Sequence, residues 1–300
     1  MKNKFFTRKF VPAAQIRRLW KGMVIFMKIR RNEQNDVVYL TSSVIENTGI
    51  VTHGISTRSG GVSQGFLGAM NLSYTRGDEK ERVDENFRRI GAAIGFDVRN
   101  LVFTDQTHTA NVRIVTEEDR GKGFVRERDY SDVDGLVTNV PGLVLAAFFA
   151  DCVPLLFVDR VNRAIGIAHS GWRGTVEKIG RRTVELMQAQ YGTNPSDVAA
   201  AIGPSICSDC YEVSEDVAEV FEKQFPDTYN EIVRNGKEKG KYQLDLWRAN
   251  YDVLTQAGIP AANIEMPGIC TCCNKEFLHS HRGSHGNRGN IGAFLMLNEL

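Results

Sequence analysis

The chain has 300 residues, and 42% of them are hydrophobic. A chain of this size buries enough apolar surface to fold without disulfides or a structural metal. Its 37 basic and 36 acidic residues leave a formal net charge of +1. This balance argues against a general electrostatic attraction to nucleic acid or to an anionic membrane. We therefore expect specific contacts with small molecules.

The sequence pattern predicts neither a signal peptide nor a membrane helix. The first residues are basic, but charges interrupt their apolar positions, so no signal-peptide core is expected. No stretch approaches the ~20 consecutive apolar residues of a membrane helix. Six cysteines without a secretion signal fit reduced thiols, and we expect a cytoplasmic protein.

Residues 1–34 match none of the later patterns, and Met23 and Met27 both precede the first clear strand. We interpret this segment as a loosely ordered extension. A surface amphipathic helix is the alternative, because several of its apolar residues can share one helical face. Residues 35–300 contain no linker rich in Pro, Gly or Ser and are predicted to form one catalytic domain.

Hydrophobic periodicity predicts alternating strands and helices along the rest of the chain. Strands are expected at residues 37–40, 49–57, 101–104, 112–115, 134–138, 143–149, 155–158, 164–168, 198–202, 244 and 290–297. Helices are expected at residues 81–94, 175–191, 215–225 and 245–257. The charged segment 117–132 is predicted to be a solvated, mobile loop that covers a site. The alternation indicates one α/β domain with mixed sheets.

The strands at residues 155–158 and 164–168 are joined by a polar turn and predict a β-hairpin. Cys152 precedes the first strand, and His169 follows the second. A hairpin returns the chain to the edge of the sheet from which it started. We therefore expect the thiol and the imidazole to lie side by side.

His108 follows the strand at residues 101–104 and adds a third candidate ligand. Two imidazoles and a thiolate are typical of catalytic zinc, which keeps a fourth position for water or substrate. Copper is compatible with the same ligands. A metal-free alternative has Cys152 as a nucleophile and His169 as its base, as in Cys/His hydrolases. The second histidine favours zinc.

Charged residues near this hairpin are candidates for substrate contacts. Arg58 ends a strand beside paired glycines, and Arg173 lies at the start of the helix predicted at residues 175–191. Free amides at a helix start favour an anion, and both guanidinium groups can bind phosphate. Asp134 either acts on a substrate hydroxyl or a proton, or is an ordinary turn residue before a glycine.

Five further cysteines lie outside this site, namely Cys207, Cys210, Cys270, Cys272 and Cys273. A C-x-x-C pair and a C-x-C pair can together supply four thiolates to a structural zinc. Small buried thiols are the alternative. Nothing in the sequence brings the two halves together.

Nine short segments, in this order, resemble the laccase-domain purine nucleoside phosphorylase family. That family was formerly called multicopper polyphenol oxidase, and it includes a peptidoglycan-editing factor. The segments are STRSGGVS (56–63), NLS (71–73), QTH (106–108), DGLVT (134–138), ADCVP (150–154), AHSGWRGT (168–175), IGPSI (202–206), YEV (211–213) and CTCC (270–273). The resemblance covers residues 35–298.

The resemblance implies a single α/β/β/α sandwich and a zinc enzyme whose ligands are His108, Cys152 and His169. It further implies phosphorolysis of adenosine, inosine and guanosine, cleavage of methylthioadenosine, and deamination of adenosine. The expected partners are purine nucleosides and phosphate. No nucleic acid or membrane is expected, and the sequence identifies no partner protein.

Substrate-binding residues follow from the same resemblance. The candidates are Arg58, Asn71, Gln106, Arg173 and Arg282. The C-terminal segment departs from the family pattern, because Ser-His-Arg at residues 280–282 is followed by an unusual turn, His-Gly-Asn-Arg-Gly, at residues 285–289. If that loop contacts the substrate, specificity differs from that of the family.

Two other activities stay open. A copper-dependent polyphenol oxidoreductase would need several copper sites, and one set of suitably soft ligands is visible. A cysteine-dependent hydrolase that edits peptidoglycan precursors would use Cys152 as its nucleophile, and its activity would survive chelation.

Overall fold

The computed structural model describes residues 27–31 and 36–299. The loose extension expected at residues 1–34 falls mostly outside this described part. Lys28–Arg31 form strand β1, however, and β1 pairs antiparallel with β2 (Val38–Thr41). This part of the expected extension therefore belongs to a sheet. No helix among the described residues is long and apolar enough to cross a membrane.

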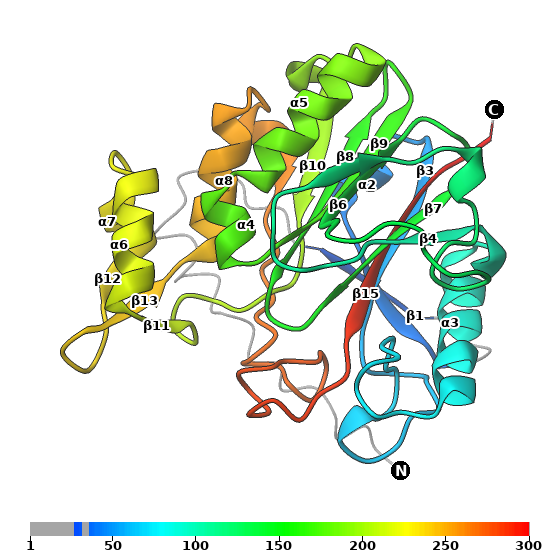
Figure 1. Ribbon diagram of the computed structural model, residues 1–300, viewed down its shortest axis with the longest axis horizontal. Helices are drawn as coiled ribbons and strands as arrows, with labels where there is room; N and C mark the ends of the chain where they lie inside the picture. Colours follow the sequence, from blue (N-terminus) through cyan, green and yellow to red (C-terminus); the bar gives the residue numbers. More distant parts are fainter. Residues whose placement is uncertain (1–26, 32–35, 300) are drawn as a thin grey trace.

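Two six-stranded mixed sheets pack face to face (Figure 1). The first has the order β1-β2-β3-β15-β7-β4, and the second has the order β14-β10-β8-β9-β6-β5. The other strands of the first sheet are β3 (Val51–Ser56), β4 (Leu101–Phe103), β7 (Val144–Phe149) and β15 (Ile291–Leu297). The second sheet consists of β5 (Val112–Ile114), β6 (Gly135–Thr138), β8 (Val153–Asp159), β9 (Ala164–Ser170), β10 (Val198–Ile202) and β14 (Ile264–Glu265).

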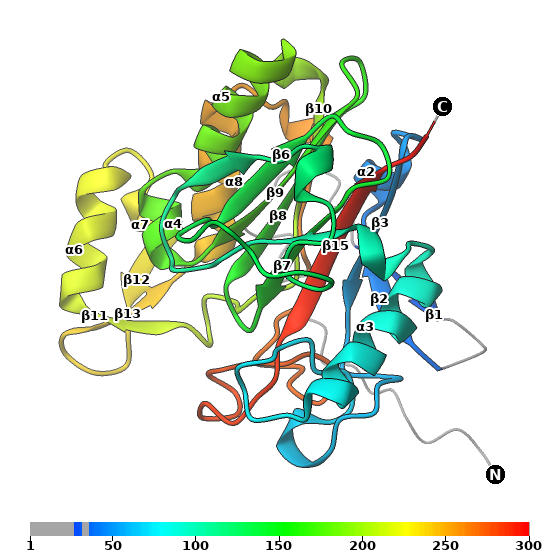
Figure 2. The ribbon, with the colours of Figure 1, turned by 45° about the vertical axis from the view of Figure 1, so that its right-hand side comes forward.

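Helices cover the outer faces of both sheets (Figures 1 and 2). Helix α3 (Lys80–Ile94) covers the first sheet. The second sheet is covered by α4 (Trp172–Val176), α5 (Ile179–Tyr191) and α8 (Leu246–Gln256). The short helix α2 (Ser43–Glu46) joins β2 to β3. This layering confirms the predicted α/β/β/α sandwich.

A small third sheet extends from one side of the sandwich (Figure 1). Its strand order is β11-β13-β12, and all its pairs are antiparallel. The elements of this side are β11 (Glu212–Ser214), α6 (Glu215–Gln224), α7 (Tyr229–Ile232), β12 (Val233–Asn235) and β13 (Lys241–Leu244). The sequence predicted α6 and a strand at Leu244, but not the sheet, because its strands have only three or four residues.

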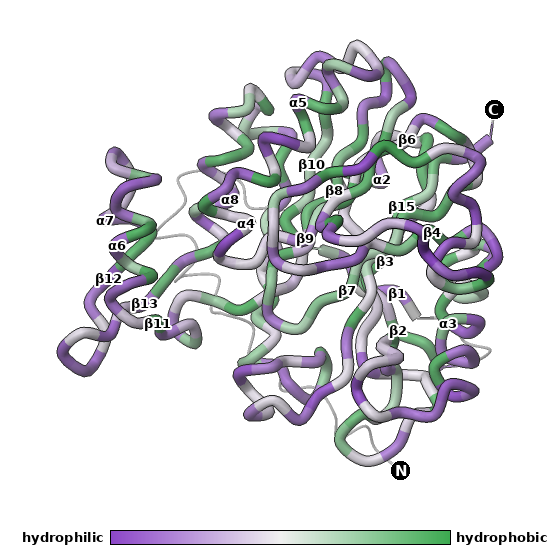
Figure 3. Tube along the Cα trace, viewed as in Figure 1, coloured by the Kyte–Doolittle hydropathy of each residue, from purple (hydrophilic) through white to green (hydrophobic). Residues whose placement is uncertain are grey.

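The hydrophobic core has a central layer between the two large sheets. Leu145 and Leu295 of the first sheet pack there with Leu156 and Ile167 of the second, and all four are fully buried. Outer layers lie beneath the helices. In one of them, Phe87 of α3 stacks on the ring of Phe103. The strands of the two large sheets are accordingly rich in hydrophobic residues, whereas the loop between β12 and β13 is hydrophilic (Figure 3).

One local prediction is wrong. The helix expected at residues 175–191 is divided into α4 and α5, because Lys178 adopts a left-handed backbone conformation with φ of 61°. Helix α4 begins at Trp172 and has only five residues, so the helix start expected to attract an anion belongs to a short helix. The strands expected at residues 134–138 and 143–149 are present as β6 and β7; they lie in different sheets, and the turn at Pro141-Gly142 carries the chain between them.

A buried histidine makes the stability of this fold depend on pH. His53 lies on β3, and its Nε2 accepts a hydrogen bond of 2.9 Å from the main-chain N–H of Ser42. Burial disfavours the imidazolium form and lowers the pKa of His53 to about 4. The unfolded chain, with a pKa of about 6.5, therefore binds more protons than the folded chain between these two values.

We expect the free energy of unfolding to decrease as the pH falls below about 6.5, and His53 to contribute about 2 kcal/mol of the loss between about pH 8 and pH 5. Urea unfolding of the wild type and of His53→Gln at both pH values measures this contribution. The variant should lose that part of the pH dependence, whereas replacement of the exposed His285 by Gln should retain it. Equal pH dependence in all three proteins would contradict the assignment.

Candidate metal centre

The β8–β9 hairpin brings Cys152 and His169 together, as predicted. Pro154 lies opposite His169 in the register, so Cys152, immediately before β8, sits beside the end of β9. All residues of both strands are buried. The two side chains therefore project from a closely packed scaffold that keeps their positions fixed.

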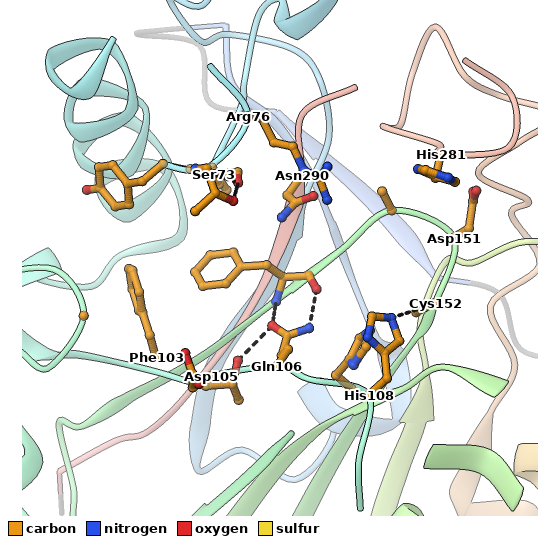
Figure 4. Close-up of a pocket in the computed structure, with 18 of the residues that line it drawn as sticks. Ser73, Arg76, Phe103, Asp105, Gln106, His108, Asp151, Cys152, His281 and Asn290 are labelled. Atoms are coloured by element: carbon orange, nitrogen blue, oxygen red, sulfur yellow. Dashed lines mark hydrogen bonds between the residues drawn. The ribbon is translucent and has the colours of Figure 1, made fainter. Parts of the chain in front are cut away.

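His108 completes a cluster of three ligand atoms. It lies on the loop between β4 and β5, in a left-handed conformation with φ of 67°. Its Nε2 lies 3.9 Å from Sγ of Cys152, and the centroids of the His108 and His169 rings are 4.9 Å apart (Figure 4). The ligand atoms of the three residues all lie within 4.8 Å of one another. The structure thus brings together the three residues predicted from separate strand ends.

Asp134 contacts two of these ligands, the ring of His169 and the main chain of His108. It immediately precedes β6, whose Gly135 lies opposite Ala168, so its carboxylate reaches the neighbouring His169. The Asp134 carboxylate lies 2.7 Å from Nδ1 of His169 and accepts hydrogen bonds from the main-chain N–H groups of residues 107–109. A partner on Nδ1 leaves Nε2 of His169 available as a ligand.

The contacts of Asp134 differ from the expected contact with a substrate. Its side chain is fully buried and does not line the cavity beside the cluster. Burial raises the pKa of this carboxyl, but the hydrogen bond and the charge of His169 outweigh burial, and the pKa is lowered. An ionised carboxylate whose oxygens are already filled by donors acts as a positioning group.

Cys152 and His169 shift each other's protonation. Burial raises the pKa of the Cys152 thiol, but His169 and His108 outweigh burial and lower it to about 6. For His169, burial lowers the pKa, whereas Cys152 and Asp134 together raise it to about 9. The pair therefore favours a thiolate beside an imidazolium. A thiolate is the form of cysteine that binds metals and also the form that acts as a nucleophile.

The three residues fit a zinc ion. Zn–N and Zn–S bonds of about 2.0–2.3 Å place neighbouring ligand atoms of one tetrahedral ion about 3.3–3.8 Å apart, close to the spacing found here. Gly171 leaves the necessary room, because a Cβ at this position would lie 2.9 Å from the His108 ring and 3.2 Å from Sγ of Cys152. The same donors also suit copper.

A cavity of about 1170 Å³ opens beside the cluster (Figure 4). Its wall includes His108, Cys152 and His169. The basic residues that line it are Arg76, Arg126, Arg128, Arg173, Arg282 and Arg288. The acidic ones are Asp105, Glu127 and Asp151. The cavity is therefore suited to an anionic ligand next to the cluster.

Two of the expected substrate-binding residues hold loops in place. The guanidinium group of Arg58 donates to the main-chain carbonyls of Phe66, Gly68 and Lys275, and Arg58 does not line the cavity. Asn71 is fully buried, and it bonds main-chain and side-chain groups of its own loop and the N–H of Asn290. These contacts favour structural roles, since all three nitrogens of the Arg58 guanidinium group bond main-chain carbonyls.

Three other expected residues line the cavity. The amide of Gln106 donates to the carbonyl of Phe148 at 2.6 Å and accepts from its N–H at 2.8 Å, which fixes Gln106 against β7 (Figure 4). Arg173 is exposed and stacks over the Trp172 ring at 4.4 Å. The guanidinium group of Arg282 donates to the carbonyls of Cys210 and Glu212.

The charged segment 117–132 forms part of the cavity wall, as expected of a covering loop. Ion pairs within the segment hold it together, because the Lys122 ammonium group lies 2.7 Å from Asp119 and 2.8 Å from Asp129. The Tyr130 hydroxyl also donates to the carbonyl of Phe103. This loop is therefore fastened to β4, in contrast to the free, solvated loop expected from its charges.

Sequence reasoning assigned no role to several residues of the cavity wall. Tyr211 and Asp151 lie inside motifs that carry the resemblance, so their positions were a usable signal. Arg76 lies in an unpatterned polar loop, and Arg288 lies in the turn that departs from the family pattern. Neither arginine gives a local signal, because its approach to the cavity depends on loop packing.

Comparison with known proteins places this arrangement in a family. A family model described as "Multi-copper polyphenol oxidoreductase laccase" matches residues 52–298. The chain belongs to this family. The matched residues include the complete His/Cys cluster and the cavity wall.

Relatives and solved structures agree with this membership. Purine nucleoside phosphorylase YlmD of Bacillus subtilis is 37% identical over 85% of this chain and 91% of that protein. Adenosine deaminase RL5, from an unknown prokaryotic organism, is 38% identical over 73% of this chain and 84% of its own length. The crystal structure of YlmD from Geobacillus stearothermophilus matches with a TM-score of 0.82 and 33% identity, over 90% of this chain and 99% of that one.

The contacts of Asp134 generate a prediction about metal affinity. Asp134→Asn removes the charge that fixes His169, so we expect zinc to bind about 10–100-fold more weakly. Competition with a chromophoric chelator measures the affinity. The matched control is Asp132→Asn, because the exposed Asp132 bonds the same loop without contacting His169. Unchanged affinity in Asp134→Asn would show that this carboxylate does not position the ligand.

Proposed function

We propose that this protein is a zinc-dependent purine nucleoside phosphorylase that acts on adenosine, inosine, guanosine and methylthioadenosine, and that it also deaminates adenosine. The observation that carries the proposal is a His/His/Cys cluster that opens onto a cavity lined by arginines and aromatic rings. The relatives named purine nucleoside phosphorylase and adenosine deaminase support it. The six free cysteines fit the reducing cytoplasm, where we expect the enzyme to act.

The cavity offers suitable surfaces for a nucleoside. Phe148, Trp172 and Tyr211 present aromatic rings to it, and a purine base stacks favourably on such rings. Its volume of about 1170 Å³ slightly exceeds the roughly 300–1,000 Å³ of ordinary ligand pockets. The space therefore suits a nucleoside and a phosphate ion together.

Three arginines are candidates for binding the phosphate. No carboxylate among the described residues pairs with Arg76 or Arg173, and both side chains are exposed at the cavity. Arg288 is partly buried, and its Nε lacks a hydrogen-bond partner within the described part of the chain. Burial and the charge of Arg76 lower the pKa of Arg288 to about 10, so it stays charged at neutral pH. Such groups bind phosphate oxygens strongly.

The proposed reactions place distinct demands on these groups. In phosphorolysis, a phosphate oxygen bonds to the anomeric carbon while the bond from that carbon to the base breaks. The base leaves with the electron pair and takes up a proton. In deamination, water adds to the purine carbon that bears the amino group, and ammonia leaves. The arginines hold and neutralise the phosphate in the first reaction, whereas the aromatic contacts with the base serve both reactions.

His108, Cys152 and His169 would hold the zinc ion. When bound, zinc supplies a Lewis acid and lowers the pKa of a coordinated water to about 7. Asp134 keeps the His169 ring oriented, and Gly171 leaves space for the three side chains. The surrounding strands keep the ligands in place during turnover.

The cysteine hydrolase alternative keeps one observation in its favour. The lowered pKa of Cys152 beside His169 also suits a nucleophilic thiolate. Chelation separates the two functions, because a nucleophilic cysteine needs no metal. Multicopper oxidation is less well supported, because the described residues contain one cluster that includes histidine.

Activity with adenosine tests the proposal directly. We expect adenosine to yield free adenine only in the presence of phosphate, with ribose 1-phosphate as the second product. Cys152→Ala should lose both this activity and the zinc of the site, because one of three ligands is removed. Cys272→Ala is the matched control and should retain both. Full activity of a metal-free preparation, measured by product chromatography, would overturn the proposal.

The arginines should affect the two reactions differently. Arg173→Gln removes a charge-assisted contact worth roughly 1.5–3 kcal/mol, so we expect the KM for phosphate to rise about 10–100-fold. Adenosine deamination needs no phosphate and should keep its rate. Arg160→Gln, an exposed change in the β8–β9 turn, is the control. An unchanged KM for phosphate would exclude Arg173 as a phosphate ligand.

A further inference from the structure

A second group of cysteines meets on the other side of the cavity wall. Cys207 and Cys210 lie on the loop after β10, and Cys270 and Cys273 lie on the segment after β14. Their four sulfur atoms all lie within 4.8 Å of one another, and we call this group the four-cysteine cluster. The fold thus joins two halves that are more than fifty residues apart in the sequence, and it does so through two C-x-x-C pairs.

The two segments are held in register by main-chain bonds. Ser205 and Cys270 form a parallel bridge, and the N–H of Thr271 donates to the carbonyl of Ser205. The indole Nε1 of Trp247 donates to Oγ of Ser205 at 2.7 Å, which fastens the first segment to α8. The meeting of the cysteines is therefore a consequence of the backbone arrangement around them.

The sulfur spacing matches that of a tetrahedral metal site. Four sulfurs at about 2.3 Å from one zinc ion lie about 3.8 Å apart. Here Sγ of Cys273 lies 4.0 Å from Sγ of Cys207 and 3.4 Å from Sγ of Cys210. A disulfide would require about 2.05 Å, so neither pair is bonded. The cluster has the size of a site for a single ion.

Main-chain donors already point at one of the sulfurs. Sγ of Cys270 accepts hydrogen bonds from the N–H of Cys207 at 3.2 Å and from the N–H of Cys273 at 3.4 Å. Hydrogen bonds of this kind support the sulfur of a metal-bound cysteine, and four thiolates near one another are stable only around a cation. The neighbouring Cys272 is not a member of the cluster.

We propose that the four-cysteine cluster binds a structural zinc ion, separate from the metal centre at His108, Cys152 and His169. Four thiolates fill a tetrahedral zinc completely, so this site has no position for water or substrate. The ion crosslinks the loop after β10 to the C-terminal segment.

This crosslink supports the wall of the cavity. Ile206 and Tyr211 come from the first segment, and Arg282 comes from the second. The Arg282 guanidinium donates to the carbonyl of Cys210, and its main-chain N–H donates to the Asp151 carboxylate at 2.6 Å. Asp151 directly precedes Cys152, so these contacts connect the structural site to the other metal centre.

Metal content of the protein tests this proposal. We expect two zinc ions per chain in the wild type purified under reducing conditions, and one in Cys210→Ser/Cys273→Ser. Cys272→Ser is the matched control, since it alters a cysteine next to the cluster, and it should retain two ions. A double variant with the same zinc content as the wild type, or a wild-type protein without zinc, would overturn the proposal.

A second measurement does not depend on the folding of the double variant. Cys152→Ala should retain one zinc ion, and its X-ray absorption spectrum should show four sulfur ligands at about 2.3 Å. Nitrogen ligands in that spectrum, the absence of zinc, or a Cys210–Cys273 disulfide detected by mass spectrometry would each refute the structural site. Nucleoside phosphorolysis is assayed separately, so a failure of either proposal leaves the other distinguishable.

Discussion

The buried carboxylate of Asp134 is the group on which the candidate metal centre depends. It binds the His169 ring and the main chain of residues 107–109, so one ligand on β9 and one on the loop between β4 and β5 rely on one charge. A buried carboxylate persists only when its oxygens are filled by donors. The ligands and their anchor therefore stabilise one another, and the centre forms as a cooperative unit.

The cavity beside this centre is built from parts with different tasks. The β8–β9 hairpin supplies two ligands from a fully buried scaffold, whereas loops supply every arginine of the cavity wall except Arg173, which lies on α4. Contacts behind the loops stabilise their irregular backbone. In one part of the wall the ion pairs of Lys122 hold a loop together, and in another part main-chain bonds join the two segments that carry the four-cysteine cluster. Loops can hold functional side chains in precise positions when such contacts replace the regular hydrogen bonds of a sheet.

Sequence reasoning located what depends on local pattern and missed what depends on packing. The β8–β9 hairpin followed from two apolar runs and a polar turn, so the proximity of Cys152 and His169 was predictable. Helix α3 followed from its periodicity. By contrast, Arg58 was expected at a phosphate, but its donors are used by distant carbonyls that no local pattern reveals. The role of Asp134 depends on the register of β6 against β9, and the left-handed Lys178 that divides α4 from α5 has no sequence signal.

The position of β15 has a consequence for how the protein is made. This strand lies between β3 and β7 and pairs with both, yet it is the last strand of the described chain (Figure 1). Until residues 291–297 leave the ribosome, the first sheet exists as two separate groups of strands with exposed edges. The second sheet needs none of these residues. During synthesis the second sheet can therefore form before the first. The nascent chain carries unpaired strands of the first sheet until residues 291–297 have been made.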